Sequence, residues 1–256
     1  MRKMTPDEKA KWSKVFAEYD AKTASSMYAL RSIAHHFVEN EILIERDAQN
    51  EVQKNLPKLK PPTSDDEISE FMFERDQARQ LHDETLIPMH RYSCIVMLYI
   101  TVERELRRLT DNLQVQKKQK LKVKELRGSC LEQTNKFLAV FYDFEISQCP
   151  QYQALHDLQK IRNCIVHCQG DLALCNDQER DYLVKLKGKY KGLFAHPKSH
   201  VDMKRACIKD FLIKAAEFFI WVFQQLQQHQ PVEKLNWKIN PSAELKVLEK
   251  ILARIE

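Results

Sequence analysis

Glycine is scarce in this chain of 256 residues: only four occur, and none of them precedes residue 128. Sandwiches, barrels and dinucleotide-binding folds need glycine at their tight turns, so the scarcity argues against all three. Neither of the common glycine-rich phosphate loops is present. Long apolar runs are missing as well. The longest, 94–102 and 218–223, fall far short of the roughly 20 residues that a membrane-spanning helix needs, so no contact with a membrane is expected.

The chain also lacks the marks of a secreted protein. Its cysteines number seven, an odd count, and their spacing indicates no disulfide framework. Residues 1–12 are charged and contain no apolar stretch of the kind found in a secretory signal. We therefore expect a reducing, cytoplasmic location. The formal net charge of +5 permits contact with nucleic acid without requiring it.

Apolar residues recur at three- and four-residue steps along most of the chain, which predicts an all-α protein. Residues 188–203 contain two glycines and a proline, and they are expected to form a loop or a short hairpin. Helix-capping pairs such as Ser129 with Glu132 mark several helix starts. Helices are expected over 5–55 (with a break considered near Asn40), 64–81, 88–115, 129–141, 150–169, 176–186, 205–230 and 241–255.

One stretch, 158–170, carries the chemistry. Apolar side chains follow one face of a helix there, and Gly170 is placed to end it. The polar residues Arg162, Asn163 and His167 lie off that apolar face. Arginine can present paired donors to phosphate oxygens, and the ordinary pKa of histidine, about 6.5, suits proton transfer near neutral pH. Asn163 lies one turn before His167, so it is placed to orient the imidazole or to touch a substrate.

The segment 162–167 resembles the Arg-x(4–6)-His motif of the HEPN family, including the polar residue that the family favours after the arginine. A second likeness lies over 87–109, which is similar to the first core helix of that family and ends in a Glu-x-x-Leu tail at Glu103 and Leu106. Together the likenesses cover roughly residues 85–230. They imply a HEPN-like antiparallel helical bundle over 85–230, with an N-terminal helical extension, 1–84, and a C-terminal tail, 231–256, that carries a short amphipathic helix.

The resemblance also implies an activity. HEPN ribonucleases are endonucleases that need no metal or other cofactor: the 2′-hydroxyl of RNA attacks the neighbouring phosphate, leaving a cyclic phosphate and a 5′-hydroxyl. Arg162, Asn163 and His167 are then the expected catalytic residues. Such proteins commonly form homodimers in which two motifs face one cleft. Many act as toxins or phage-defence effectors, so an antitoxin or another regulatory protein is an expected partner.

Two basic runs, over 117–127 and 185–205, are the expected contacts to RNA, although each is equally well explained as a solvated surface. The RNA-binding residues expected within them are Lys117, Lys118, Lys120, Lys187, Lys189 and Lys191. A third group of charges, over 103–108, is better explained as a ladder on a helix surface. No metal site is expected. A zinc cluster could be assembled only from Cys164, His167, Cys168 and Cys175, but His167 and Cys168 point to different helix faces, and the chain has no Cys-x-x-Cys pair.

Two alternatives to the ribonuclease remain open. The chain is also compatible with a non-catalytic HEPN-like module that binds RNA, a nucleotide or a protein partner. It is also compatible with a purely structural helical adaptor that uses its N-terminal helix for assembly. Cleavage of RNA without divalent metal separates the ribonuclease from the binding module, and salt-dependent binding to nucleic acid separates both nucleic-acid functions from the adaptor.

Overall fold

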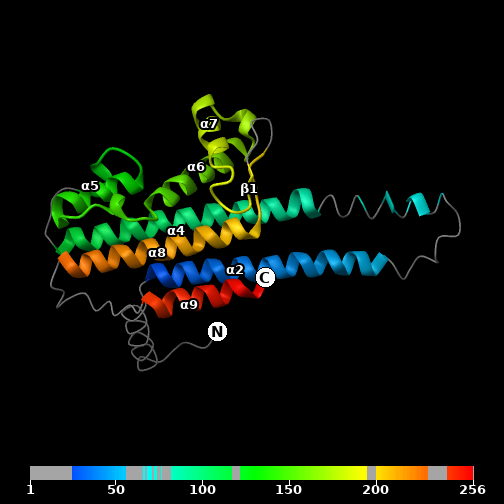
Figure 1. The fold of residues 1–256 in the computed structure, drawn as a ribbon, viewed down its shortest axis with the longest axis horizontal. Helices are drawn as coiled ribbons and strands as arrows, with labels where there is room; N and C mark the ends of the chain where they lie inside the picture. The colour runs from blue at the N-terminus through cyan, green and yellow to red at the C-terminus, as the bar shows by residue number, and fades with distance from the viewer. Residues whose placement is uncertain are drawn as a thin grey trace, which may run out of the picture. The chain divides into compact units, whose positions relative to one another are not determined.

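The computed structural model describes residues 25–55, 66, 68–70, 72–73, 76, 82–116, 122–194, 200–229 and 241–255. Within them 83% of the residues are helical, and the strands form one two-stranded antiparallel ribbon (Figure 1). The prediction of an all-α protein is confirmed at this level. The helices are α2 (Ser25–Asn55), α4 (Ile87–Gln116), α5 (Cys130–Tyr142), α6 (Tyr152–Cys168), α7 (Asp177–Lys185), α8 (Arg205–His229) and α9 (Pro241–Leu252).

Shorter elements connect these helices. A π-helical turn, η1 (His82–Leu86), leads directly into α4, so Pro88 follows one helical turn and lacks the N–H that a regular i→i−4 hydrogen bond would use there. The 3₁₀ turns are η2 (Val123–Glu125), η3 (Ile146–Gln148), η4 (Leu172–Leu174) and η5 (Ala253–Ile255). Strands β1 (Leu193–Phe194) and β2 (Asp202–Met203) pair as Leu193 with Met203 and Phe194 with Asp202.

The described residues divide into two compact units. Unit 1 combines the described parts of Met1–Ser32, Leu98–Asp157 and Phe211–Glu249. Its part of α4 lies beside its part of α8 (Figure 1). Phe211, Phe218 and Phe219 of α8 are fully buried there, with the rings of Phe218 and Phe219 in edge contact at 5.5 Å. The Tyr142 hydroxyl donates to the Leu113 carbonyl at 2.9 Å, which ties the end of α5 to the end of α4.

Unit 2 combines the described parts of Ile33–Met97, Leu158–Asp210 and Lys250–Glu256. Phe37 of α2 is fully buried and stacks on His90 of α4, with 5.8 Å between ring centroids. The Tyr92 hydroxyl donates to the carbonyl of Val201, just before β2. These contacts join α2 to α4, and α4 to the ribbon, so elements far apart in the sequence form one core.

Most predicted elements correspond to observed ones, with differences at their ends. Ser129 and Glu132 form the predicted reciprocal cap of α5, and the residues 188–203 contain the ribbon, as the hairpin interpretation required. The break considered near Asn40 does not occur. Helix α2 is continuous there, and the Asn40 amide donates to the carbonyl of His36 at 2.9 Å within the helix. Most of the predicted helix 64–81, and residues 5–24 of the first, lie outside the described residues.

One described stretch, 84–115, is long and apolar enough to cross a membrane by length and composition alone. The buried central helix of a soluble protein passes the same test. In unit 2 the α4 side chains of Cys94 and Ile95 are buried within the fold. The expectation that no segment spans a membrane stays a prediction.

Gly170 closes α6 in a conformation that only glycine adopts without strain. Its φ is +79°, and a Cβ at this position would overlap the Tyr92 hydroxyl and ring. Gly188 has a similar φ of +83°, but nothing lies within 4 Å of a Cβ placed there. We expect Gly170→Ala to lower the free energy of unfolding by about 2–5 kcal/mol, from backbone strain plus overpacking. Gly188→Ala should cost only about 1 kcal/mol, from backbone strain alone.

Urea denaturation of both variants measures this difference. Gly188→Ala serves as the matched control because it carries the same backbone penalty without the clash. Equal losses in the two variants would show that Tyr92 yields to the added methyl group at no cost.

Candidate functional site

The predicted catalytic residues lie in the last turns of α6, within unit 2. The apolar face of this segment is held in the core: Leu158 and Ile161 are fully buried and Ile165 is 9% exposed. This is the face that the sequence pattern predicted. Its burial fixes the rotation of α6 about its axis, and therefore fixes which residues can meet solvent.

Arg162, Asn163 and His167 differ in their exposure to solvent. Arg162 and Asn163 are half-buried, whereas His167 is exposed in the final turn. The Arg162 Nη1 atom donates to Asn163 Oδ1 at 3.0 Å. Asn163 and His167 are one turn apart, so their side chains share one side of the helix. The hydrogen bond thus draws the guanidinium toward the side that carries the imidazole.

The backbone after His167 is fixed by a short network. Gln169 takes a left-handed conformation, with φ of 55°, and the Gly170 N–H donates back to the Cys164 carbonyl at 3.1 Å. The Gly170 carbonyl in turn accepts from the Val201 N–H at 2.8 Å. The helix end is therefore bonded to the chain that enters β2. This network holds the backbone that carries His167 in one position.

The predicted RNA-binding lysines divide into two sets. Lys117, Lys118 and Lys120 lie outside the described residues. Lys187, Lys189 and Lys191 are exposed on the turns that lead from α7 to β1, in the same unit as the motif. Lys189 Nζ lies 5.4 Å from the centre of the Tyr190 ring, a cation–π contact that limits its freedom. Three ammonium groups on one turn are suited to a phosphate backbone.

Three thiols pack behind the motif. Cys164, Cys168 and Cys175 are buried, with 3.5 Å between the sulfurs of Cys164 and Cys175. Burial raises the pKa of each of these thiols to about 11, so they are protonated at neutral pH. All seven cysteines are free and buried. Within the described residues no group of three or more potential ligands is placed to hold a metal ion.

A buried carboxylate in unit 2 was not anticipated from the sequence. Glu41 of α2 is 2% exposed and accepts from Arg91 Nε at 3.1 Å and from Arg205 Nε at 2.6 Å. His90 Nε2 lies 3.9 Å from the same carboxylate. Burial alone would raise the pKa of Glu41, but the two guanidiniums outweigh it and the pKa is lowered. Burial lowers the pKa of His90, despite the attraction of Glu41.

This group, the Glu41 cluster, positions α2, α4 and α8 within unit 2. Arg91 also donates through Nη1 to the Met203 carbonyl at 3.0 Å, so it reaches the ribbon as well. The hydrogen bonds of the cluster thus join these three helices and the ribbon, and they fix part of the frame in which the motif lies.

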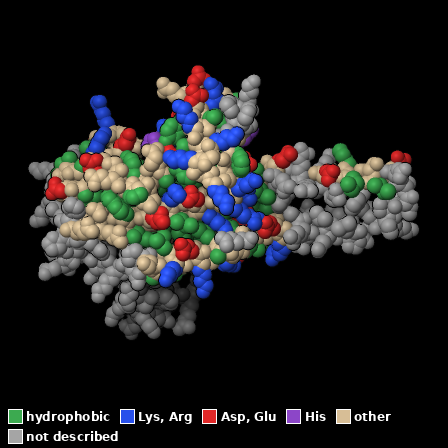
Figure 2. All heavy atoms as spheres, viewed as in Figure 1, with side chains coloured by type: hydrophobic (Ala, Val, Ile, Leu, Met, Phe, Trp, Pro, Cys, Tyr) green, Lys and Arg blue, Asp and Glu red, His purple; other side chains and the backbone are tan. Residues whose placement is uncertain are grey.

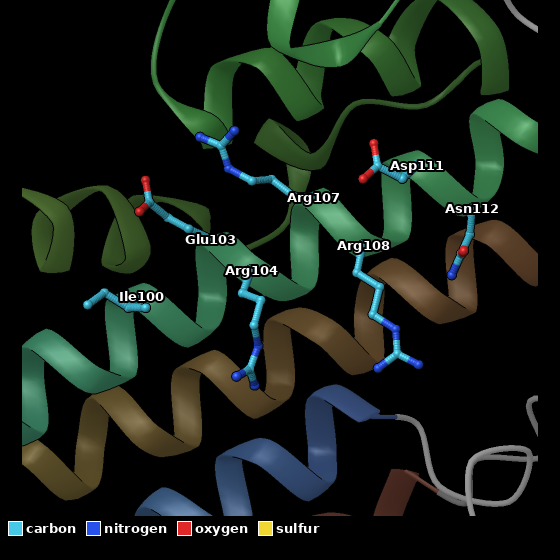
Figure 3. A pocket seen from close by; sticks show the side chains of 7 residues that line it. All are labelled: Ile100, Glu103, Arg104, Arg107, Arg108, Asp111 and Asn112. Carbon is cyan, nitrogen blue, oxygen red and sulfur yellow. The ribbon is translucent and has the colours of Figure 1, made fainter.

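A charged hollow of about 590 Å³ lies in unit 1, along α4 (Figure 3). Its lining comes from a single stretch of that helix: Ile100, Glu103, Arg104, Arg107, Arg108, Asp111 and Asn112. The sequence pattern explained the charges over 103–108 as a surface ladder. That explanation is wrong for Glu105, which is 5% exposed and accepts from Arg104 Nε at 3.1 Å. On the face drawn in Figure 2, both basic and acidic side chains are present among the described residues.

Comparison with protein-family models, curated proteins and solved structures found no match to this chain. The likeness to HEPN proteins accordingly rests on the residues of the motif and of the helix upstream.

Proposed function

We propose that this protein is a metal-independent endoribonuclease of the HEPN type. The observation that supports it best is the set of side chains at the end of α6. Asn163 accepts a hydrogen bond from the Arg162 guanidinium, and the exposed imidazole of His167 follows Asn163 by one helical turn. These are the groups that cleavage of a phosphodiester by its own 2′-hydroxyl requires. The buried opposite face and the fixed helix end make the arrangement rigid, as a catalytic site needs.

The reaction needs two proton transfers and one site of charge stabilisation. The 2′-hydroxyl loses its proton to an imidazole, its oxygen bonds to phosphorus, and the bond from phosphorus to the 5′-oxygen breaks. The leaving oxygen takes a proton, giving a 2′,3′-cyclic phosphate and a 5′-hydroxyl. The Arg162 guanidinium offers paired donors to the phosphoryl oxygens as their charge rises. In a homodimer, the second copy of His167 would supply the second proton carrier.

The biological setting proposed with this activity is that of a cytoplasmic toxin or antiviral-defence effector. An uncontrolled ribonuclease would damage its own cell, so a regulatory protein or antitoxin is the natural partner. The exposed position of His167 makes such control simple, because a protein that covers the end of α6 would block access to the imidazole.

A second candidate is a helical module of the same kind that binds RNA without cleaving it. The hollow along α4 favours this function. Three arginines and two carboxylates line it, and the lining residues include no histidine that could transfer protons. Binding groups of that type hold phosphates and bases but cannot by themselves carry out both proton transfers.

The proposal is tested by incubating the protein with short single-stranded RNAs in a buffer containing EDTA and by locating any cut in the strand. We expect cleavage, with cyclic phosphate and 5′-hydroxyl ends. We expect no cleavage of the same strand when a 2′-deoxynucleotide replaces the residue before the cut, because the nucleophile is then missing. Mass spectrometry of the products reads the ends. Cleavage of the deoxy-substituted strand, or loss of all activity in EDTA, would refute this mechanism.

A further inference from the structure

The lining of the α4 hollow forms two rows along the helix. Side chains four residues apart lie above one another on a helix face. One row consists of Ile100, Arg104, Arg108 and Asn112, and the other of Glu103, Arg107 and Asp111. In Figure 3 the side chains of Arg104, Arg108 and Asn112 point to one side of α4, and those of Glu103, Arg107 and Asp111 point to the other. The hollow therefore has a cationic edge and a mixed edge.

The cationic edge is incompletely neutralised. Arg104 uses its Nε atom on Glu105, at 3.1 Å, and its two outer nitrogens remain directed away from the helix (Figure 3). Among the described residues, the guanidinium of Arg108 has no hydrogen-bond or ion-pair partner. Like charges at this spacing repel by about 0.2–0.5 kcal/mol. A ligand with negative charges along this edge would remove that repulsion and satisfy both guanidiniums.

The mixed edge restricts what that ligand can be. Within the described part of the chain, the carboxylates of Glu103 and Asp111 carry no hydrogen bond, and both would repel a ligand that is only anionic. They favour a ligand that also offers N–H donors. Arg107 lies between them and can stack on a planar ring. Ile100, 46% exposed at one end of the hollow, adds an apolar contact for such a ring.

We propose that the α4 hollow binds a single strand of RNA. Phosphates lie along Arg104 and Arg108, and bases lie over the mixed edge, where their amino groups donate to Glu103 and Asp111. From residue 100 to 112 the helix rises about 18 Å, which suits several nucleotides better than one. An acidic peptide or a polyphosphate would meet the same arginines but leave both carboxylates unsatisfied. The inference deepens the proposed function and rests on RNA being its substrate.

The first test measures binding in EDTA to labelled oligocytidylate of about ten nucleotides, by fluorescence anisotropy. A His167→Ala background prevents cleavage during the measurement. We expect Arg104→Gln with Arg108→Gln to raise Kd about tenfold. Loss of two phosphate contacts should also lower the slope of log Kd against log salt concentration by about 1.4. Arg108→Gln alone should lower the slope by about 0.7, and Lys246→Gln, an exposed lysine of unit 1 outside the hollow, should leave it unchanged.

The second test compares oligocytidylate with oligouridylate, which differ in one amino group per base. We expect the wild-type hollow to favour cytosine, because its amino group donates to a carboxylate. Glu103→Gln with Asp111→Asn should remove that preference without weakening the salt dependence. An unchanged preference for cytosine in this variant would show that Glu103 and Asp111 do not accept hydrogen bonds from the bases.

These outcomes separate the hollow from the motif. Equal binding and equal salt slopes in wild type and the double arginine variant would overturn the hollow as an RNA site, even if the protein cleaves RNA in EDTA. Arginine-dependent binding by a protein that cleaves no RNA would refute the ribonuclease and leave the hollow standing. Tighter arginine-dependent binding of polyglutamate or polyphosphate than of RNA would assign the hollow to another kind of ligand and overturn this inference.

Discussion

Replacement of His167 by alanine is expected to lower the rate of RNA cleavage by about 10³-fold, within the range that general acid–base groups contribute. Within the motif, only the imidazole is a side chain of the type that transfers protons near neutral pH. The variant should still bind RNA, because it keeps the guanidinium and the exposed lysines. Single-turnover cleavage in EDTA, with enzyme in excess, measures the chemical step directly.

His35→Ala is the matched control, since His35 is also an exposed histidine on a helix of the described chain. It should cleave at the wild-type rate. Circular dichroism and sedimentation should report unchanged helicity and oligomeric state for both variants. Undiminished cleavage by His167→Ala would remove the mechanism, and an equal loss in both variants would show that the assay reports folding.

Glu41→Gln is expected to destabilise unit 2 by about 3–5 kcal/mol at pH 7, the usual cost of removing one partner from a buried ion pair. The glutamine keeps the shape of the side chain but leaves Arg91, whose side chain is 13% exposed, without a buried counter-charge. Arg205 keeps a second partner in Glu45, so Arg91 bears most of the loss. Urea denaturation followed by far-UV circular dichroism measures the change.

The same variant gives a signed dependence on pH. The pKa of Glu41 is lowered in the folded protein, so its ionised form stabilises the fold above its ordinary pKa of 4.5. That contribution is lost as the pH falls through the lower, folded value. The difference in unfolding free energy between wild type and Glu41→Gln should therefore be complete at pH 7 and shrink below about pH 4.5.

Glu39→Gln provides the control for this experiment. Glu39 also pairs with an arginine, Arg254, at 2.8 Å, but the two side chains are 54% and 46% exposed. Solvent screens such a pair, and its loss should change stability by no more than about 0.5 kcal/mol. If Glu41→Gln were as mild as Glu39→Gln, the Glu41 cluster would not hold the frame of unit 2.

Sequence patterns correctly predicted the features that depend on residues close together in the chain. The cap at Ser129, the start of α9 at Pro241 and the apolar face of α6 all follow from residues within a few positions of one another. The one-turn relation between Asn163 and His167 is of the same kind. Gly170 was predicted to end α6, although the left-handed turn already begins at Gln169, which no composition rule singles out.

Long-range contacts could not be predicted in this way. Glu41, Arg91 and Arg205 belong to three helices, and nothing in their local surroundings distinguishes them from surface charges. Glu105 was expected to lie on the surface for the same reason, because periodicity alone does not decide which side of a mixed helix is covered. The hydrogen bond from Arg162 to Asn163 depends on the choice of a side-chain rotamer, which the packing of unit 2 makes.

The close contact between Tyr92 and Gly170 links two distant positions in evolutionary terms. Any side chain at 170 would have to occupy the space of the Tyr92 ring, and the Tyr92 hydroxyl also bonds to Val201. A lineage that acquires a larger residue at 170 therefore needs a smaller one at 92, and with it another donor for the Val201 carbonyl. Among descendants of this protein, positions 92 and 170 should covary, and a change at one without the other should be rare.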